Sequence, residues 1–252
     1  MHECGSDLTG QTAVVTGASR GIGSAIAQGF LRAGADVVTL QRADPGPELE
    51  EAASAADRRL THHSVDLTNE ASIREVAVDV LAAHPVDILV NNAGTQIRNE
   101  AVDFALDDLD ATMNINLRAV FQLCQVFGAS MVERGRGKII NLASMLSFQG
   151  GYRTSAYAAS KGAVVQLTKA LCNEWAGHGV NVNAVAPGYL STEMTEALRA
   201  DTARSQEISA RIPAGRWGTP EDLVGPVVFL ASNAADYIHG AVIPVDGGWL
   251  AR

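Results

Sequence analysis

A phenol and an ammonium lie four residues apart in Tyr157-x-x-x-Lys161, within a run of good helix formers that contains no proline. Four residues make about one helical turn, so both side chains are expected on one face. A tyrosine titrates near 10 in water, and a fixed cation nearby stabilises its phenolate and lowers its pKa. The pair therefore predicts a general acid/base, although this spacing alone is common on helix surfaces.

Two other positions carry polar groups that could take part in the same chemistry. Ser144 follows a short apolar run and precedes Tyr157 by enough chain to bring its hydroxyl beside the phenol, where it would bind a substrate carbonyl and the alkoxide formed from it. Asn114 and Asn116 lie among apolar neighbours in a predicted helix, where a buried amide needs a hydrogen-bond partner. The residue pattern leaves the choice between these two asparagines open.

Alternating apolar and helical segments must position these groups. Strands are predicted over 12–16, 36–40, 61–66, 87–90, 138–142, 180–185 and 241–245, and helices over 24–33, 48–56, 69–83, 106–133, 155–176 and 221–232. Continuous apolar strands separated by helices predict a doubly wound α/β fold, with a seven-stranded parallel sheet covered on both faces. No internal repeat or linker divides the chain, so a single domain is expected over 1–252.

Three glycines follow the first predicted strand and precede a helix. Gly17, Gly21 and Gly23 would let the backbone approach a pyrophosphate, whose charge sits at the helix N-terminus. In doubly wound folds the site lies outside the carboxyl ends of the strands. The residues directly after each strand are therefore candidates for the same site: Gln41, Arg42, Asp66, Leu67, Asn91, Asn92, Ala93, Gly94, Ser144, Pro187 and Gly188.

Composition limits the partners and the compartment. The 252 residues are 47% hydrophobic and carry a net charge of −9, which argues against nucleic acid or an anionic membrane as a general partner. Cys4, Cys124 and Cys172 show neither disulfide nor metal-ligand spacing. The polar N-terminus and the lack of an apolar run of membrane-spanning length lead us to expect a cytoplasmic protein.

Seven motifs in order resemble the classical short-chain dehydrogenase/reductase family: Thr16-Gly17-x-x-x-Gly21-x-Gly23, Asp66-Leu67, Asn91-Asn92-Ala93-Gly94, Asn116, Ser144, Tyr157-x-x-x-Lys161 and Pro187-Gly188 with Thr192. The resemblance covers essentially the whole chain. It implies a Rossmann fold with a cofactor half at about 8–145 and a catalytic and substrate half at about 146–252. It also implies hydride transfer between a nicotinamide cofactor and a secondary alcohol or ketone.

The same resemblance assigns roles to individual residues. Asn116, Ser144, Tyr157 and Lys161 would form the catalytic tetrad, with Asn116 anchoring a water and Lys161 both lowering the tyrosine pKa and binding the nicotinamide ribose. Asp66 would contact the adenine, Asn92 and Gly94 the adenosine side, and Thr192 the carboxamide. The full set expected at the cofactor is Gly17, Ser19, Arg20, Gly21, Ile22, Gly23, Gln41, Arg42, Asp66, Leu67, Asn92, Ala93, Gly94, Tyr157, Lys161, Pro187, Gly188 and Thr192.

The choice between NADP(H) and NAD(H) depends on the end of the second strand. A carboxylate there would bind the ribose diol and repel a 2′-phosphate. This chain instead has Gln41 and Arg42, with Arg20 in the glycine loop, which favours NADP(H). The second half of the chain resembles the 2-deoxy-D-gluconate 3-dehydrogenases, also described as 2-keto-3-deoxy-D-gluconate 5-dehydrogenases, which are mostly associated with NAD(H), so that alternative stays open.

This closer resemblance rests on 139–151, 173–176, 211–218 and 245–252, and it implies a deoxy sugar acid as substrate. Arg98 and Arg153 are the candidate anchors for its carboxylate, Gln149 for its hydroxyls, and the polar segment 191–211 is a candidate lid. Alternatives are a 3-oxoacyl-thioester or broad carbonyl reductase, and a non-catalytic cofactor-binding regulator. The family is often tetrameric, with the segment near Trp249 at a subunit interface.

Overall fold

A seven-stranded parallel sheet with the strand order β3-β2-β1-β4-β5-β6-β7 runs through the computed structural model, which describes residues 6–252. Cys4 lies outside the described residues. The strands are β1 (Thr12–Thr16), β2 (Asp36–Gln41), β3 (Leu60–Ser64), β4 (Ile88–Asn91), β5 (Gly137–Leu142), β6 (Val180–Pro187) and β7 (Val242–Val245). The chain runs outward from β1 to β3 and then returns to place β4 on the other side of β1, which makes the β1–β4 border the topological switch point.

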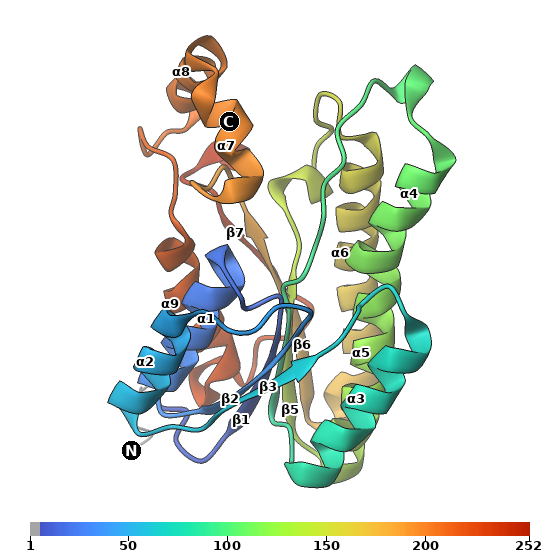
Figure 1. The fold of residues 1–252 in the computed structure, drawn as a ribbon, viewed down its shortest axis with the longest axis vertical. Helices are drawn as coiled ribbons and strands as arrows, with labels where there is room; N and C mark the ends of the chain where they lie inside the picture. The colour runs from blue at the N-terminus through green and yellow to red at the C-terminus, as the bar shows by residue number, and fades with distance from the viewer. Residues whose placement is uncertain (1–5) are drawn as a thin grey trace.

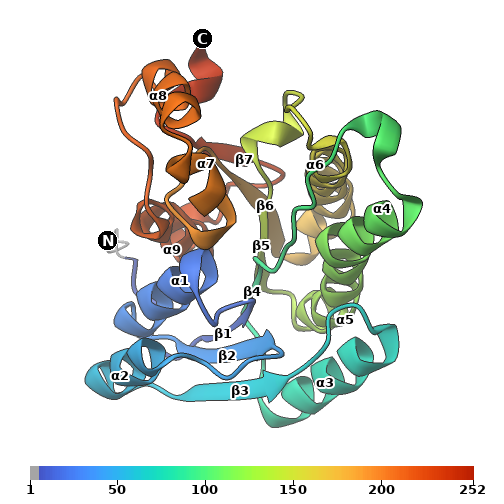
Figure 2. The same cartoon turned by 45° about the horizontal axis from the view of Figure 1, so that its top comes forward.

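Helices cover both faces of this sheet (Figure 1). The helices are α1 (Gly21–Arg32), α2 (Pro47–Ala56), α3 (Glu70–Ala83), α4 (Leu106–Met113), α5 (Ala119–Arg134), α6 (Ser155–Trp175), α7 (Glu196–Ala200), α8 (Thr202–Arg211) and α9 (Val224–Ala231). One layer holds α1, α2 and α9, and the other holds α3, α4, α5 and α6 (Figure 2). The predicted three-layer α/β architecture is confirmed.

Strand periodicity divides the apolar residues between two cores. Val15 packs with Phe30 of α1 on one face, whereas the preceding Val14 packs with Phe127 and Met131 of α5 on the other. Because successive side chains of a strand point to opposite faces, an unbroken apolar run supplies both layers. This is why the strands read as continuous hydrophobic stretches in the sequence.

The helix predicted over 106–133 is interrupted. A π-helical turn, Asn114–Arg118, separates α4 from α5 and places Asn116 in the interior. The whole segment Leu106–Arg134 is long and apolar enough by composition to cross a membrane, but half of its most apolar window is buried. Phe127 and Met131 are completely buried in the core beside the sheet, so we assign it as a core helix of the domain.

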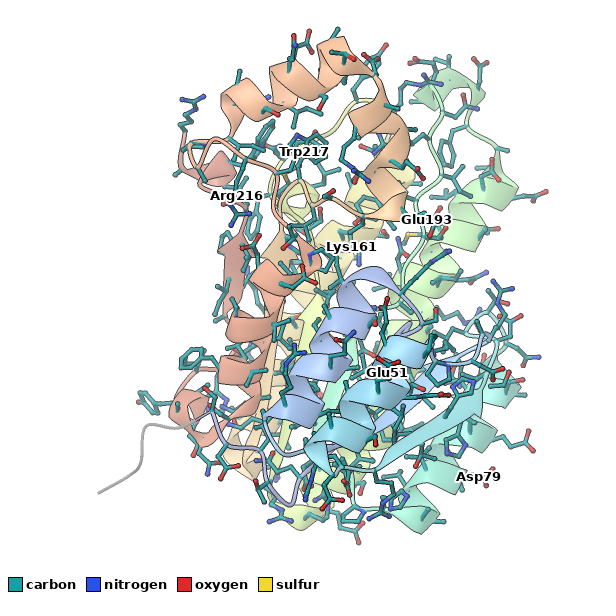
Figure 3. The ribbon with its side chains drawn as sticks, turned by 60° about the vertical axis from the view of Figure 1, so that its left-hand side comes forward. Glu51, Asp79, Lys161, Glu193, Arg216 and Trp217 are labelled. Atoms are coloured by element: carbon teal, nitrogen blue, oxygen red, sulfur yellow. The ribbon has the colours of Figure 1, made fainter. Side chains whose placement is uncertain are left out.

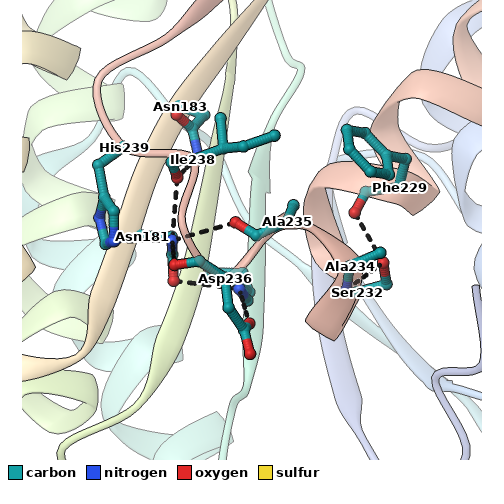
Figure 4. A network of polar contacts seen from close by, with 10 residues as sticks. Asn181, Asn183, Phe229, Ser232, Ala234, Ala235, Asp236, Ile238 and His239 are labelled. Carbon is teal, nitrogen blue, oxygen red and sulfur yellow. Dashed lines mark hydrogen bonds and ion pairs between the residues drawn. The ribbon is translucent and has the colours of Figure 1, made fainter. Parts of the chain in front are cut away.

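The loop that leads into β7 is held by amides from β6 (Figure 4). Asn181 donates its side-chain amide to the carbonyls of Asp236 and Ile238, each at 2.9 Å, and Asn183 also donates to Ile238. Lys138 of β5 approaches both Asn181 at 3.0 Å and the Asp236 carboxylate at 2.6 Å. This network lies near the amino ends of β5 and β6, away from the edge where the site is expected.

The predicted lid 191–211 folds into the 3-10 turn Glu193–Thr195 followed by α7 and α8, seen in orange in Figure 2. Ile208 of helix α8 and Ile212, which directly follows it, pack with Met145 and Trp249, and all four residues are buried. The Trp249 ring also meets Tyr189 edge-on, with centroids 4.9 Å apart. Trp249, expected near a subunit interface, is thus buried in its own chain, where it supports the lid.

Candidate active site

A cleft of about 1200 Å³ opens along the carboxyl ends of the strands. It is lined by residues from both halves of the chain, and the glycine loop, the end of β2, the segment after β4 and the start of α6 all contribute. Of the residues assigned to cofactor, catalysis or substrate from the sequence, only Asn116 and Gln149 are not among its lining residues. Figure 3 shows Lys161 between the glycine-loop helix α1 and the lid, with Glu193 above α1.

The glycine loop fits a dinucleotide pyrophosphate. Gly17 and Gly21 adopt φ values of +67° and +57°, which favour glycine, and a side chain at Gly23 would collide with the Gly17 carbonyl oxygen and the Asn92 amide. Open space lies beside Gly21, at the N-terminus of α1. The backbone amides of this helix end can therefore face an anion in the cleft.

The motif after β4 supports that loop. Asn92 donates its side-chain amide to the carbonyls of Thr16 and Gly17, at 2.9 and 3.1 Å. The Thr16 hydroxyl accepts in turn from the backbone N–H groups of Asn92 and Ala93. The Asn92 side chain therefore positions the glycine loop as well as lining the cleft. Gly94 lies deeper, close to the Asn116 oxygen.

Four polar side chains line the cleft where β1, β2 and β3 end. Gln41 accepts from the Ala18 N–H at 2.6 Å, while its buried Nε2 has no hydrogen-bond partner among the described residues. Arg42 is exposed near Asp66, whose pKa is lowered mainly by hydrogen bonds from Thr68. Arg20 is engaged by Glu193 of the lid at 2.6 Å, although both side chains are largely exposed, at 75% and 60%.

Tyr157 and Lys161 project from the first turns of α6 with their ring centroid and Nζ 5.8 Å apart. The net fall expected in the pKa of Tyr157 is not found, because burial dominates and raises this pKa, opposed by the Ser144 hydroxyl and, less strongly, by the charge of Arg98. Burial also lowers the pKa of Lys161 to about 8. The ammonium donates to the Leu142 carbonyl at 2.6 Å.

Ser144 and Asn116 are held by backbone partners. The Ser144 hydroxyl caps the turn after β5 by accepting from the Leu146 N–H at 3.1 Å. Asn116 exchanges two hydrogen bonds with the backbone of Thr95, at 2.8 and 2.9 Å, and donates to the Ser160 hydroxyl at 3.0 Å. The amide thus joins the segment after β4 to α6. Of the two candidate asparagines, Asn116 is fully buried and Asn114 is not.

Three arginines line the part of the cleft next to the tyrosine. Arg98 lies near the rings of Tyr157 and Tyr189, and its pKa is lowered by burial and, less strongly, by the charges of Arg153 and Arg204. Arg153 has a φ of +59°, in the left-handed region that favours glycine. Gln149, expected to bind hydroxyls, does not reach the cleft.

Sequence reasoning missed Arg204, Tyr189 and Ser160. Arg204 lies in a polar helix whose spacing shows no special pattern, and its place in the cleft depends on how α8 packs. Ser160 was visible only as a serine between Tyr157 and Lys161, although it accepts from Asn116 and donates to the Tyr157 carbonyl. A buried serine in a helix between catalytic residues is a signal that could have found it.

A dinucleotide-binding loop at the switch point, beside a Ser–Tyr–Lys set that lines the same cleft, defines a nicotinamide-dependent oxidoreductase. Residues 17–250 match the family model described as Enoyl-(Acyl carrier protein) reductase. The chain is 48% identical, over 98% of both chains, to 2-dehydro-3-deoxy-D-gluconate 5-dehydrogenase of Dickeya dadantii (strain 3937). It belongs to the short-chain dehydrogenase/reductase family.

Solved structures agree with this assignment. A putative NAD(P)-dependent gluconate 5-dehydrogenase from Beutenbergia cavernae, with bound NADP at low occupancy, has a TM-score of 0.95 and 52% identity, covering 98% of this chain and 99% of that one. A putative 2-deoxy-D-gluconate 3-dehydrogenase from Agrobacterium tumefaciens, with bound NADP, has a TM-score of 0.92 and 48% identity over the same shares. The predicted hydride-transfer activity is confirmed at the level of the family.

Proposed function

We propose that this protein interconverts a secondary alcohol and a ketone of a deoxy sugar acid, such as 2-deoxy-D-gluconate or 2-keto-3-deoxy-D-gluconate, using NADP(H). The main support for an acidic substrate is that Arg98 lies near Tyr157 in the cleft, which places a cation beside the proton donor. A guanidinium binds carboxylates through paired hydrogen bonds. The names of similar proteins point to the same substrate class.

Tyr157 moves the proton at its phenolic oxygen. Burial keeps the phenol protonated at neutral pH, so it donates to the carbonyl oxygen during reduction and takes the proton back during oxidation. Ser144, whose hydroxyl opposes the rise in the pKa of this phenol, holds the same substrate oxygen. The bound nicotinamide supplies or accepts the hydride.

Lys161 and Asn116 support this proton transfer in different ways. The buried ammonium of Lys161, fixed by the Leu142 carbonyl, provides positive charge that favours the developing phenolate. Asn116 holds the segment after β4 against α6, which fixes the distance between the cofactor half and the tyrosine. We assign Asn116 as a positioning residue on these contacts.

The preference for NADP(H) is supported by the exposed Arg42 at the end of β2 and by the amide of Gln41, where a carboxylate would repel a 2′-phosphate. Arg20 is a second cation near this position, but its pairing with Glu193 competes with phosphate binding. Fluorescence titration with NADPH and NADH tests the preference. Tighter binding of NADH would overturn it.

A panel of sugar acids, keto acids and 3-oxoacyl thioesters, assayed by nicotinamide absorbance with both cofactors, tests the substrate class. We expect turnover of deoxy sugar acids, and Arg98→Ala and Arg153→Ala should raise the KM for them. Preferential turnover of an acyl thioester would favour the reductase alternative. Cofactor binding without turnover of any ketone would instead indicate a regulator.

We also propose that the protein acts in the cytoplasm as a homotetramer. Phe121 on α5 is exposed although it is apolar, as expected of a residue that another subunit covers. Sedimentation velocity would test the assembly, with a monomer as the contradicting result. The segment 191–211 is proposed as a lid because Met194 and Leu198 from it line the cleft.

A further inference from the structure

Three separate segments deliver the three arginines that line the cleft next to Tyr157. Arg98 comes from the chain after β4, Arg153 from the loop before α6, and Arg204 from the first turn of the lid helix α8. Two of them have a carboxylate partner at the rim: Glu100 lies 3.5 Å from Arg153, and Glu207 lies 2.7 Å from Arg204. The arginines therefore converge on one cavity from the body of the domain and from the lid.

We propose that Arg204 is a specificity-determining residue that exchanges Glu207 for the substrate carboxylate and binds it together with Arg98. This proposal rests on the proposed function, because it requires an acidic substrate. It gives the lid a direct role in selecting that substrate. It also explains why the lid is polar at a position where a lid over an acyl chain would be apolar.

The existing partner of Arg204 is easily replaced. The pair with Glu207 is formed within one helix by side chains that are 45% and 66% exposed. Exposed pairs of this kind contribute little to stability. A carboxylate held by two guanidiniums inside the cleft is bound through charge-assisted hydrogen bonds that water screens less. The exchange from Glu207 to substrate is therefore favourable.

Arg98 makes the exchange more favourable. Arg98 is an exposed residue of the cleft lining, and the charges of Arg153 and Arg204 oppose its own, so this part of the cleft holds an excess of positive charge. Asp201 also lines the cleft near Arg204, but its carboxylate accepts from the Arg204 N–H and caps α8. An entering carboxylate relieves the repulsion among the guanidiniums, whereas a neutral ketone of the same shape does not.

The test compares 2-keto-3-deoxy-D-gluconate with its methyl ester, which lacks the charge and adds only one methyl group. Arg204→Gln should raise the KM for the acid by roughly tenfold or more and leave the KM for the ester within about twofold. Arg204→Lys should restore part of the loss, since it keeps the charge. Glu207→Gln should lower the KM for the acid by freeing Arg204. Arg74→Gln, an exposed helical arginine on α3 outside the cleft, is the matched control.

The outcomes separate this proposal from the proposed function. If the wild-type enzyme prefers the acid and Arg204→Gln retains that preference, the role of Arg204 is overturned while the proposed function stands. An equal rise in both KM values would show that Arg204 only supports the lid, which also overturns the proposal. If the wild-type enzyme shows no preference for the acid over its ester, both the proposed function and the role of Arg204 fail.

Discussion

Burial of Lys161 makes the stability of the protein depend on pH in an unusual direction. Lys161 is 4% exposed, and desolvation lowers its pKa from 10.5 to about 8. Below pH 8 the lysine is charged in both the folded and the unfolded protein, so the cost of burying the charge is present in full. As pH rises from 8 to 10.5 the folded protein has lost the proton that the unfolded chain still holds, and the cost is relieved.

The size of this effect follows from the two pKa values. Between pH 7 and 9.5 the wild-type protein should gain about 2 kcal/mol of unfolding free energy relative to Lys161→Met, which carries no titrating group at this position. The variant also leaves the Leu142 carbonyl without its donor, but that loss is the same at every pH and cancels in the comparison. Lys161→Met should lose most activity because the charge near Tyr157 is removed.

Urea unfolding of both proteins at several pH values measures the difference directly. Above pH 8 the unfolding free energy of the wild-type protein should rise steadily relative to that of Lys161→Met. A flat difference, or a shift toward the variant, would refute the reasoning that desolvation controls Lys161. The titration of every other group is common to both proteins and is removed by subtraction.

Three further perturbations address the proton donor, the positioning amide and the cofactor. Tyr157→Phe should lower kcat by roughly 10²- to 10⁴-fold without weakening NADPH binding. Unchanged turnover would show that the phenol is not the proton donor. Asn116→Ala leaves the Thr95 backbone groups without their hydrogen-bond partner, so urea unfolding should show a loss of about 2–4 kcal/mol in unfolding free energy. A loss below about 0.5 kcal/mol would contradict the positioning role. Glu193→Gln frees Arg20 and should tighten NADPH binding by roughly two- to fivefold while leaving NADH binding unchanged. If the affinities for NADPH and NADH rose equally, Arg20 would not be a ligand of the 2′-phosphate.

The sheet and most helices were predictable because their signals are local. The run Thr12–Thr16 alternates between two cores, and the glycines after it adopt backbone angles that other residues rarely adopt. The break at Asn114–Arg118 was not predictable, because an unbroken apolar periodicity gives no sign of a π turn. That break depends on the contacts that Asn116 makes with Thr95 and Ser160, far away in the chain.

The sequence by itself determined the fold class through its periodicity, and the resemblance of its ordered motifs to the short-chain dehydrogenase/reductase family indicated the reaction class. The tertiary structure decided the electrostatics. Burial raised the pKa of Tyr157 where the spacing to Lys161 had predicted a fall. Packing of α8 brought Arg204 to the cleft, and the chain between β5 and α6 places Gln149 outside it. Desolvation and long-range charge depend on the surroundings of a group in space, and no local pattern in the chain encodes those surroundings.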